Sequence, residues 1–184
     1  MAKDDEPNDD STDLELIARW RAGDERAATT LVERHAPALA RFAASLGQRV
    51  DVEEVVQDTF VRAFGSMDSF RAYSSLRTWL FTIERRLILD RRRADRRRRD
   101  DASLDDADAS TEFDALDGLV AEEAEDRVRR AVDRLSRLQR EVFLLRVNEG
   151  LSYKDIAEVV GSTEGAARVH YHNAMRAVKE SLYV

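Results

Sequence analysis

The chain has 184 residues, enough for one domain or two small ones, and its two prolines and seven glycines favour helices. It has no cysteine, which excludes disulfides, thiolate metal sites and thiol catalysis. Its acidic start is no signal peptide, and no apolar run is long enough to cross a bilayer, so we expect a cytoplasmic protein without membrane insertion.

The net charge of −7 conceals a strong segregation along the chain. Residues 14–99 carry a net charge of +6, residues 100–126 carry −12, and residues 127–184 carry +4. Two basic blocks around an acidic one indicate two modules that face a polyanion and a charged connector between them.

The first helix is expected directly after a polar, disordered start over residues 1–13. Thr12 and Glu15 have the spacing of a capping box. In that helix we expect Leu14, Ile17 and Ala18 to face inward.

A second helix should begin near Asp24 or Glu25 and end at Gly47, with Pro37 as a point where it can bend. Its apolar positions recur at helical spacing: Ala28, Leu31, Val32, His35, Leu39, Phe42 and Leu46. Because His35 lies on that stripe, we expect a packed core histidine and not a metal ligand.

Asp51 and Glu54 open a third helix whose inner face carries Val52, Val55, Val56, Phe60, Ala63 and Phe64. Its opposite face carries Glu53, Glu54, Gln57, Asp58 and Arg62. Two interpretations stay open for this face: a solvated surface, or a docking surface for a basic partner.

The fourth helix, LRTWLFTIERRLILDRRRADRRRR, combines an apolar stripe with arginine. Leu76, Trp79, Leu80, Ile83, Leu87 and Ile88 form the stripe, and the other face carries arginines from Arg77 to Arg99. Arginine binds phosphate or guanine bidentately, so this face should attract nucleic acid. An exposed aromatic among Phe70, Tyr73, Trp79 and Phe81 could stack on an unpaired base.

Residues 100–126 are predicted to form an acidic flexible linker. Helical periodicity returns after it, with apolar residues at Val128, Ala131, Leu135, Leu138, Val142, Leu145 and Val147.

A helix-turn-helix is predicted after these helices. Ser152 is a good N-cap, Gly161 suits the turn, and the second helix starts near Thr163 with Ala166, Ala167, Tyr171, Ala174 and Val178 inward.

No catalytic or cofactor site emerges from the sequence. There is no glycine-rich phosphate loop or serine elbow, and His170 and His172 lie two apart on a helix, so they face different sides. We therefore expect neither an enzyme nor a bound cofactor or metal.

Together these segments resemble a bacterial RNA polymerase sigma factor of the extracytoplasmic-function (ECF) type, in the sigma-70 family. The resemblance covers nearly all of the chain from Leu14 to Leu182. Five strings carry it in order: LIARWRAGDERAATTLVERHAPALARFA, DVEEVVQDTFVRAFGSMDSFR, SSLRTWLFTIERRLILDRRR, LQREVFLLRVNEGLSYKDIAEVVGSTEG and ARVHYHNAMRAVKESL.

The resemblance implies an all-α protein of two small helical domains: a sigma-two-like bundle over 14–99, an acidic linker over 100–123 and a sigma-four-like helix-turn-helix domain over 124–184. It implies an alternative sigma factor that binds core RNA polymerase and directs promoter recognition and DNA melting. Expected partners are the polymerase β′ clamp helices and β flap, promoter DNA and, as a further candidate, an anti-sigma factor.

The resemblance also implies three sets of site residues. Glu54, Gln57 and Asp58 are expected to bind core polymerase. The minus-ten element is melted and read by Ser74, Ser75, Leu76, Arg77, Arg85, Arg86 and Arg93. The minus-thirty-five element is read in the major groove by Arg168, His170, His172, Asn173 and Arg176.

The chain departs from the usual family pattern at two places. Arg86 stands where many relatives have asparagine, and GAARVHYHNAM replaces a GTVKSRLHRAR string, so Val169, His170 and Asn173 replace a serine and two arginines. The promoter sequence therefore cannot be borrowed from a relative. Two rival functions remain: a stand-alone helix-turn-helix regulator that binds duplex DNA as a dimer, and a degenerate sigma that holds polymerase or an anti-sigma factor without reading DNA.

The charge pattern also supports a hypothesis of self-inhibition. In the free protein, residues 100–126 would fold back onto Arg91–Arg99 and suppress DNA binding, because opposite charges of this density attract within a Debye length of about 8 Å.

Overall fold

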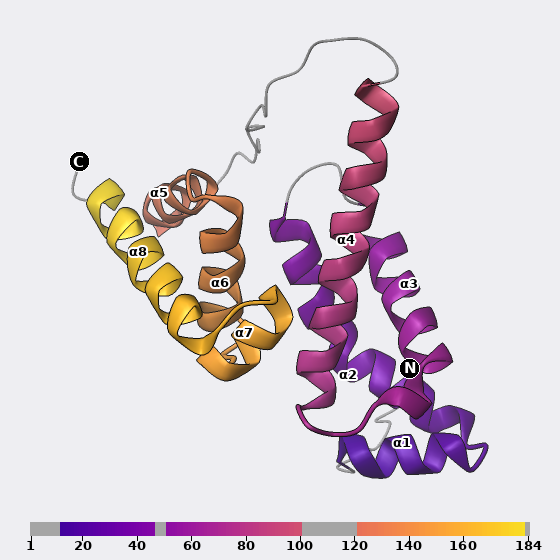
Figure 1. Ribbon diagram of the computed structural model, residues 1–184. Coiled ribbons are helices and arrows are strands. Elements are labelled where there is room, and N and C mark those ends of the chain that lie inside the picture. The colour runs from indigo at the N-terminus through magenta and orange to yellow at the C-terminus, as the bar shows by residue number, and fades with distance from the viewer. Residues whose placement is uncertain (1–11, 47–50, 101–120, 183–184) are drawn as a thin grey trace, which may run out of the picture.

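The computed structural model describes residues 12–46, 51–100 and 121–182. Within these ranges every regular element is helical, which confirms the predicted all-α class. The elements are α1 (Asp13–Arg21), α2 (Glu25–Ser45), α3 (Val52–Gly65), the 3-10 turn η1 (Met67–Ser69), α4 (Leu76–Asp100), α5 (Ala121–Asp133), α6 (Arg137–Val147), α7 (Tyr153–Val160) and α8 (Glu164–Leu182). Figure 1 shows a first bundle of α1 to α4 and a second bundle of α5 to α8, with α4 facing the second bundle.

Several expectations fall on residues outside these ranges. Gly47 and residues 101–120, which make up most of the acidic linker, lie outside the described residues. The proposed contact of residues 100–126 with Arg91–Arg99 therefore stays a prediction.

Helix α1 has the predicted cap but turns a different face inward. The Thr12 hydroxyl accepts from the Glu15 N–H at 3.3 Å, and the Glu15 carboxylate accepts from the Thr12 N–H at 2.6 Å, which confirms the capping box. The inward placement of Leu14 and Ala18 was wrong, because Leu14 is 57% exposed and Ala18 is exposed too. Ile17 is buried as predicted, and Leu16 is buried in place of Leu14. The half-buried Trp20 ring lies on Phe64, with 5.1 Å between ring centroids. The larger apolar area of this set decides which face of the helix packs.

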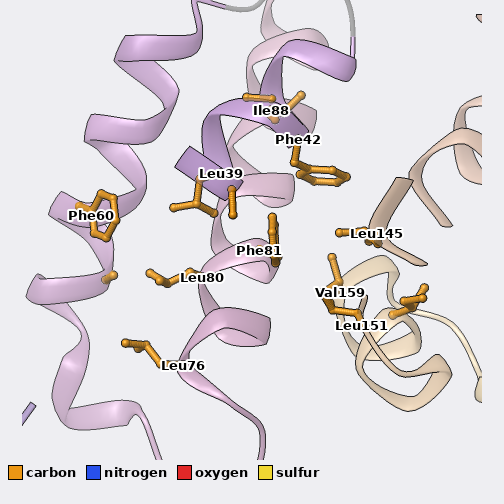
Figure 2. Packing of buried hydrophobic residues seen from close by; sticks show 14 of the residues in the cluster. Leu39, Phe42, Phe60, Leu76, Leu80, Phe81, Ile88, Leu145, Leu151 and Val159 are labelled. Carbon is orange, nitrogen blue, oxygen red and sulfur yellow. The ribbon is translucent and has the colours of Figure 1, made fainter. Parts of the chain in front are cut away.

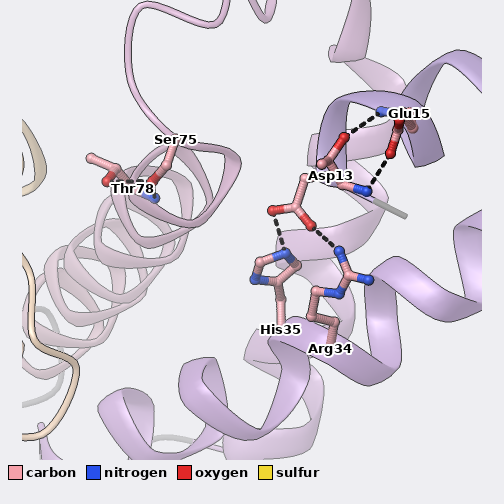
Figure 3. Close-up of polar contacts among 7 residues, drawn as sticks. Asp13, Glu15, Arg34, His35, Ser75 and Thr78 are labelled. Carbon is pink, nitrogen blue, oxygen red and sulfur yellow. Dashed lines mark hydrogen bonds and ion pairs between the residues drawn. The ribbon is translucent and has the colours of Figure 1, made fainter. Parts of the chain in front are cut away.

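His35 is a buried core histidine, as predicted. Its Nε2 lies 2.9 Å from a carboxylate oxygen of Asp13, and Arg34 donates to the other oxygen at 2.7 Å (Figure 3). Partial burial alone would raise the pKa of Asp13, but the hydrogen bonds and charges of His35 and Arg34 outweigh it and hold that pKa below its usual value. The cluster joins the start of α1 to α2. No group of His, Asp and Glu residues in the described part of the chain could hold a metal ion.

The first bundle has a conventional core whose aromatic centre is shared by α2 and α4. The rings of Phe42 and Phe81 meet edge to face, 5.4 Å apart at 82°. The predicted stripes of α2, α3 and α4 are buried or half-buried throughout. Most of these residues form one hydrophobic cluster with Leu145, Leu151 and Val159 of the second bundle, so the core is continuous across the two bundles (Figure 2).

The second face of α4 differs from the sequence prediction of an arginine surface. Thr78, Phe81, Thr82 and Glu84 are all buried, in addition to the predicted stripe. The physical reason is that α4 packs between the other helices of its own bundle and α7. A single stripe of apolar residues is expected only for a helix that packs on one side.

The second bundle packs α5 and α6 against α8. Ala131, Leu135, Val142, Leu145, Ala167, Ala174 and Val178 are buried as predicted. Val147, at the end of α6, and Val128 on α5 are exposed instead, and Val132 is buried in a position that the pattern did not indicate.

Candidate nucleic-acid interface

Helices α7 and α8 form the predicted helix-turn-helix. The Ser152 hydroxyl accepts from the Asp155 N–H at 3.1 Å and caps α7. Gly161 has a φ of 69°, the left-handed conformation that favours glycine, and the Ser162 N–H reaches back to the Ala157 carbonyl at 2.9 Å. The geometry of this turn therefore sets the direction of α8 relative to α7.

The outer face of α8 presents most of the predicted base-reading set. Arg168, His172 and Arg176 are exposed, whereas His170 and Asn173 are half-buried. Val169, which was not among the predicted DNA contacts, shares the exposed face and is 58% exposed. An exposed apolar side chain on such a helix suits the methyl group of thymine, the apolar feature of the major groove. Its spacing of three and seven residues from His172 and Arg176 is the signal that could have identified it.

Arg168 is held in place by two contacts. Its Nη2 lies 2.9 Å from the Glu164 carboxylate one helical turn earlier, and its guanidinium lies 4.9 Å from the centroid of the Tyr153 ring. Tyr153 in turn meets Tyr171 edge to face at 5.8 Å. These contacts limit the rotamers of the Arg168 side chain in the free protein. They therefore lower the entropic cost of a bidentate contact between its guanidinium and DNA.

The loop before α4 exposes one aromatic side chain. Ala72 has a φ of 56°, in the left-handed region that a non-glycine residue rarely adopts, and the Tyr73 side chain is 90% exposed. Phe70 packs on Trp79 with 5.2 Å between ring centroids, and Phe81 is fully buried. Of the four aromatics considered from the sequence, Tyr73 is thus the one free to stack on a base.

Two of the predicted minus-ten residues have structural tasks at the start of α4. The Ser75 hydroxyl accepts from the Thr78 N–H at 3.1 Å, and the two hydroxyl oxygens lie 2.9 Å apart (Figure 3). Leu76 is buried in the core. The side chain of Leu76 therefore has no access to DNA in this arrangement, whereas Ser75 is exposed.

Three further candidates contact the second bundle. The Ser74 hydroxyl donates to the Glu158 carboxylate at 2.8 Å, and Arg77 is ion-paired with Glu149. Arg85 Nε donates to the Glu141 carboxylate at 2.7 Å. Sequence reasoning could not find these pairs, since their members lie 56 to 84 residues apart.

The remaining arginine candidates on α4 point to solvent. Arg86 is exposed, and Arg93 is exposed with Asp90 at 3.3 Å, a surface pair of small energetic value. These two side chains stay accessible to a phosphate backbone.

The acidic face of α3 is accessible but partly paired. Glu53, Glu54 and Gln57 are exposed and Asp58 is half-buried. Arg91 of α4, which the sequence analysis assigned to a DNA-facing surface, lies 2.9 Å from Glu54 and 2.7 Å from Asp58. Val61, 64% exposed, lies one turn along from Gln57 and adds an apolar group to this face.

Comparison with known proteins identifies this architecture. Residues 31–98 match Sigma-70 region 2, and residues 125–178 match Sigma-70, region 4. The ECF RNA polymerase sigma-E factor of Haemophilus influenzae is 30% identical over 93% of this chain and 95% of its own length. The ECF RNA polymerase sigma factor EcfG of Rhodopseudomonas palustris is 34% identical over 80% and 81%. The chain belongs to the ECF group of the sigma-70 family.

Two solved structures share this fold. The sigma factor RpoE, in complex with the anti-sigma factor NepR from Bartonella quintana, is 31% identical, with a TM-score of 0.67 over 85% of this chain and 96% of that one. CnrH, in complex with the cytosolic domain of CnrY, is 30% identical, with a TM-score of 0.67 over 94% and 97%.

Membership of this family gives the function. The protein is an alternative sigma factor, which binds core RNA polymerase and directs promoter recognition and DNA melting at the start of transcription. None of the helices in the described ranges is long and apolar enough to cross a membrane.

Proposed function

We propose that the two bundles of this sigma factor divide the promoter between them. The second bundle reads the minus-thirty-five element through α8, and the first bundle melts and reads the minus-ten element through the 70–75 loop and the exposed arginines of α4. The observation that carries the proposal is the exposed face of α8, where Arg168, Val169, His172 and Arg176 are presented together directly after a helix-turn-helix.

The acidic face of α3 is the proposed docking surface for core polymerase. Glu54, Gln57 and Asp58 would contact the clamp helices of the β′ subunit, and the second bundle would contact the β flap. Arg91 supports this assignment, because it holds Glu54 and Asp58 at fixed positions on one side of the helix. Docking would then exchange or share the Arg91 contacts with basic groups of the polymerase.

An anti-sigma factor is a further proposed partner. Both solved relatives described above are held by a protein of that kind or by the cytosolic domain of another protein. The protein would act in the cytoplasm, at the nucleoid when it is part of the holoenzyme, and phosphodiester chemistry would belong to the polymerase core and not to this chain.

Tyr73→Ala is expected to slow promoter melting by about tenfold to a hundredfold. Stacking of a base on an aromatic ring is worth about 1–3 kcal/mol, and the Tyr73 ring makes its largest new contact only when a base is unpaired. Permanganate reactivity of the melted strand measures the effect. Tyr73→Phe keeps the ring and should melt the promoter at nearly the parental rate. Equal losses in both variants would rule out stacking.

Arg168→Ala is expected to weaken binding of holoenzyme to its promoter by about 1–3 kcal/mol if the guanidinium reads a guanine. The measurement compares the promoter with a duplex in which the minus-thirty-five element is scrambled. Glu164→Ala, which removes only the carboxylate that orients Arg168, is the matched variant and should lose less. If Arg168→Ala lost the same amount on both duplexes, its contact would be with phosphate and not with a base.

A further inference from the structure

The contact between the two bundles has an apolar centre. Phe81 of α4 and Phe42 of α2 point towards Leu145, Leu151 and Val159 of the second bundle (Figure 2). All five side chains are buried. The contact is therefore a packed interface, and the groups at its rim have defined positions.

One carboxylate of the second bundle is clamped by two arginines of the first. Glu149 accepts from Nε and Nη2 of Arg41 on α2, both at 3.1 Å, and is ion-paired with Arg77 of α4. Its side chain is almost completely buried, although it lies just before α7. A bidentate arginine is the arrangement that would equally bind a DNA phosphate.

Two further pairs complete the rim of the interface. Glu141 of α6 is buried, with Arg85 at 2.7 Å and Arg137 at 3.5 Å. Glu158 of α7 accepts from the Ser74 hydroxyl at 2.8 Å. Three carboxylates of the second bundle thus occupy Ser74, Arg77 and Arg85, the side chains proposed to contact the minus-ten element.

Glu84 is a buried carboxyl of α4 that has no hydrogen-bond partner among the described residues. It shares a face of α4 with Arg77, Phe81 and Ile88, at helical spacings of seven, three and four residues. Its side chain is 0% exposed, and neither carboxyl oxygen has a hydrogen-bond partner in the described part of the protein. Burial, and secondarily the negative charge of Glu149, raises the pKa of Glu84 to about 9.

We propose that the contact between the bundles is a proton-linked latch: it closes with Glu84 neutral, and loss of that proton separates the bundles and frees Ser74, Arg77 and Arg85 for promoter DNA. The charged groups around the latch are Glu149 with Arg41 and Arg77, and Glu141 with Arg85. Each of these arginines is already paired with Glu149 or Glu141, and none donates a hydrogen bond to either oxygen of Glu84, although Nε of Arg77 is buried without an acceptor. Ionisation of Glu84 therefore opposes closure.

The direction of the pH effect follows from proton linkage. A hydrated Glu84 in the open form titrates near 4.5, whereas in the closed form its pKa is about 9, so the closed form binds one more proton between these values. Closure is favoured at low pH and is lost as the pH rises towards 9. One proton per opening event corresponds to a ratio of open to closed molecules that rises about tenfold per pH unit in this window.

Energy transfer between two dyes on the free full-length chain tests the latch. The protein has no cysteine, so Arg62→Cys on α3 and Glu180→Cys on α8, both exposed, provide one labelling site in each bundle. Transfer is recorded from pH 6 to pH 9. We expect transfer to fall as the pH rises in the parent, and to stay high over the whole range in Glu84→Gln, which keeps the shape of the side chain and cannot ionise.

The controls separate this result from general pH effects. Glu33→Gln, which removes an exposed carboxylate on α2, should follow the parent. If Glu84→Gln were to lose helical circular dichroism, Glu84→Leu, which is also neutral, replaces it. A flat response in the parent, or an equal response in parent and neutral variant, would overturn the latch. Because neither DNA nor polymerase is present, failure here leaves the proposed promoter contacts untouched, although the consequence for DNA binding rests on them.

Discussion

Replacing Phe81 with alanine is expected to lower the free energy of unfolding by about 3–5 kcal/mol, the usual cost of emptying a fully buried phenylalanine site. Phe81 is 0% exposed, and its ring meets Phe42 edge to face within the cluster that continues into the second bundle. The side chain is fully enclosed in the core, which favours the upper part of that range. Urea denaturation followed by circular dichroism measures the change.

Leu14→Ala is the matched control for that variant. It removes an apolar side chain from a position that the sequence pattern suggested as buried, but the structure has Leu14 57% exposed. The expected change is within about 0.5 kcal/mol. A loss at Leu14 as large as that at Phe81 would contradict the packing of α1, and a small loss at Phe81 would contradict the continuous core.

Reversing the charges of Glu54 and Asp58 together, as Glu54→Lys with Asp58→Lys, is expected to weaken binding to core polymerase by about 100-fold. Each reversal removes one attractive contact with a basic partner and introduces a repulsive one, and two such changes of about 1.4 kcal/mol each give that factor. The variant also places two lysines beside Arg91, so its folding is checked by thermal denaturation. Fluorescence anisotropy with labelled sigma and unlabelled core enzyme measures the affinity.

Glu33→Lys controls for the change in net charge. Glu33 is an exposed carboxylate on α2, outside the docking face of α3, so its reversal should leave the affinity within about twofold of the parent. If both proteins bound core equally well, polymerase docking would have to lie elsewhere on the first bundle. Equal losses in both would indicate a long-range charge effect and not a contact.

Apart from α4, the amphipathic helices were predictable because each packs mainly through one stripe, and helical spacing reveals a stripe without knowledge of the partner. The inner face of α8 and the cap at Ser152 followed from spacing and local chemistry alone. The predicted inner face of α1 was wrong because Leu14 and Leu16 both fit the apolar pattern of a short helix. Only the placement of Trp20 against Phe64 decides between them. Nine residues give too few turns for the pattern to select a face.

The candidate site was predictable as a set of residue types but not as a set of contacts. The sequence predicts the same role for Arg77, Arg85 and Arg91, as parts of one arginine surface on α4. In the structure two of them pair with carboxylates of the second bundle, and the third pairs with α3. These partners are decided by tertiary packing, which also buries Glu84.

Run-off transcription tests the central conclusion most directly. Sigma-free bacterial core polymerase is combined with this protein on genomic fragments, including the region upstream of its own gene. We expect discrete starts that require this protein, share aligned minus-ten and minus-thirty-five elements, and weaken with Arg168→Ala. Binding to core without any such starts, under conditions in which the same core transcribes with another sigma factor, would contradict it and leave a protein that holds polymerase without reading promoters.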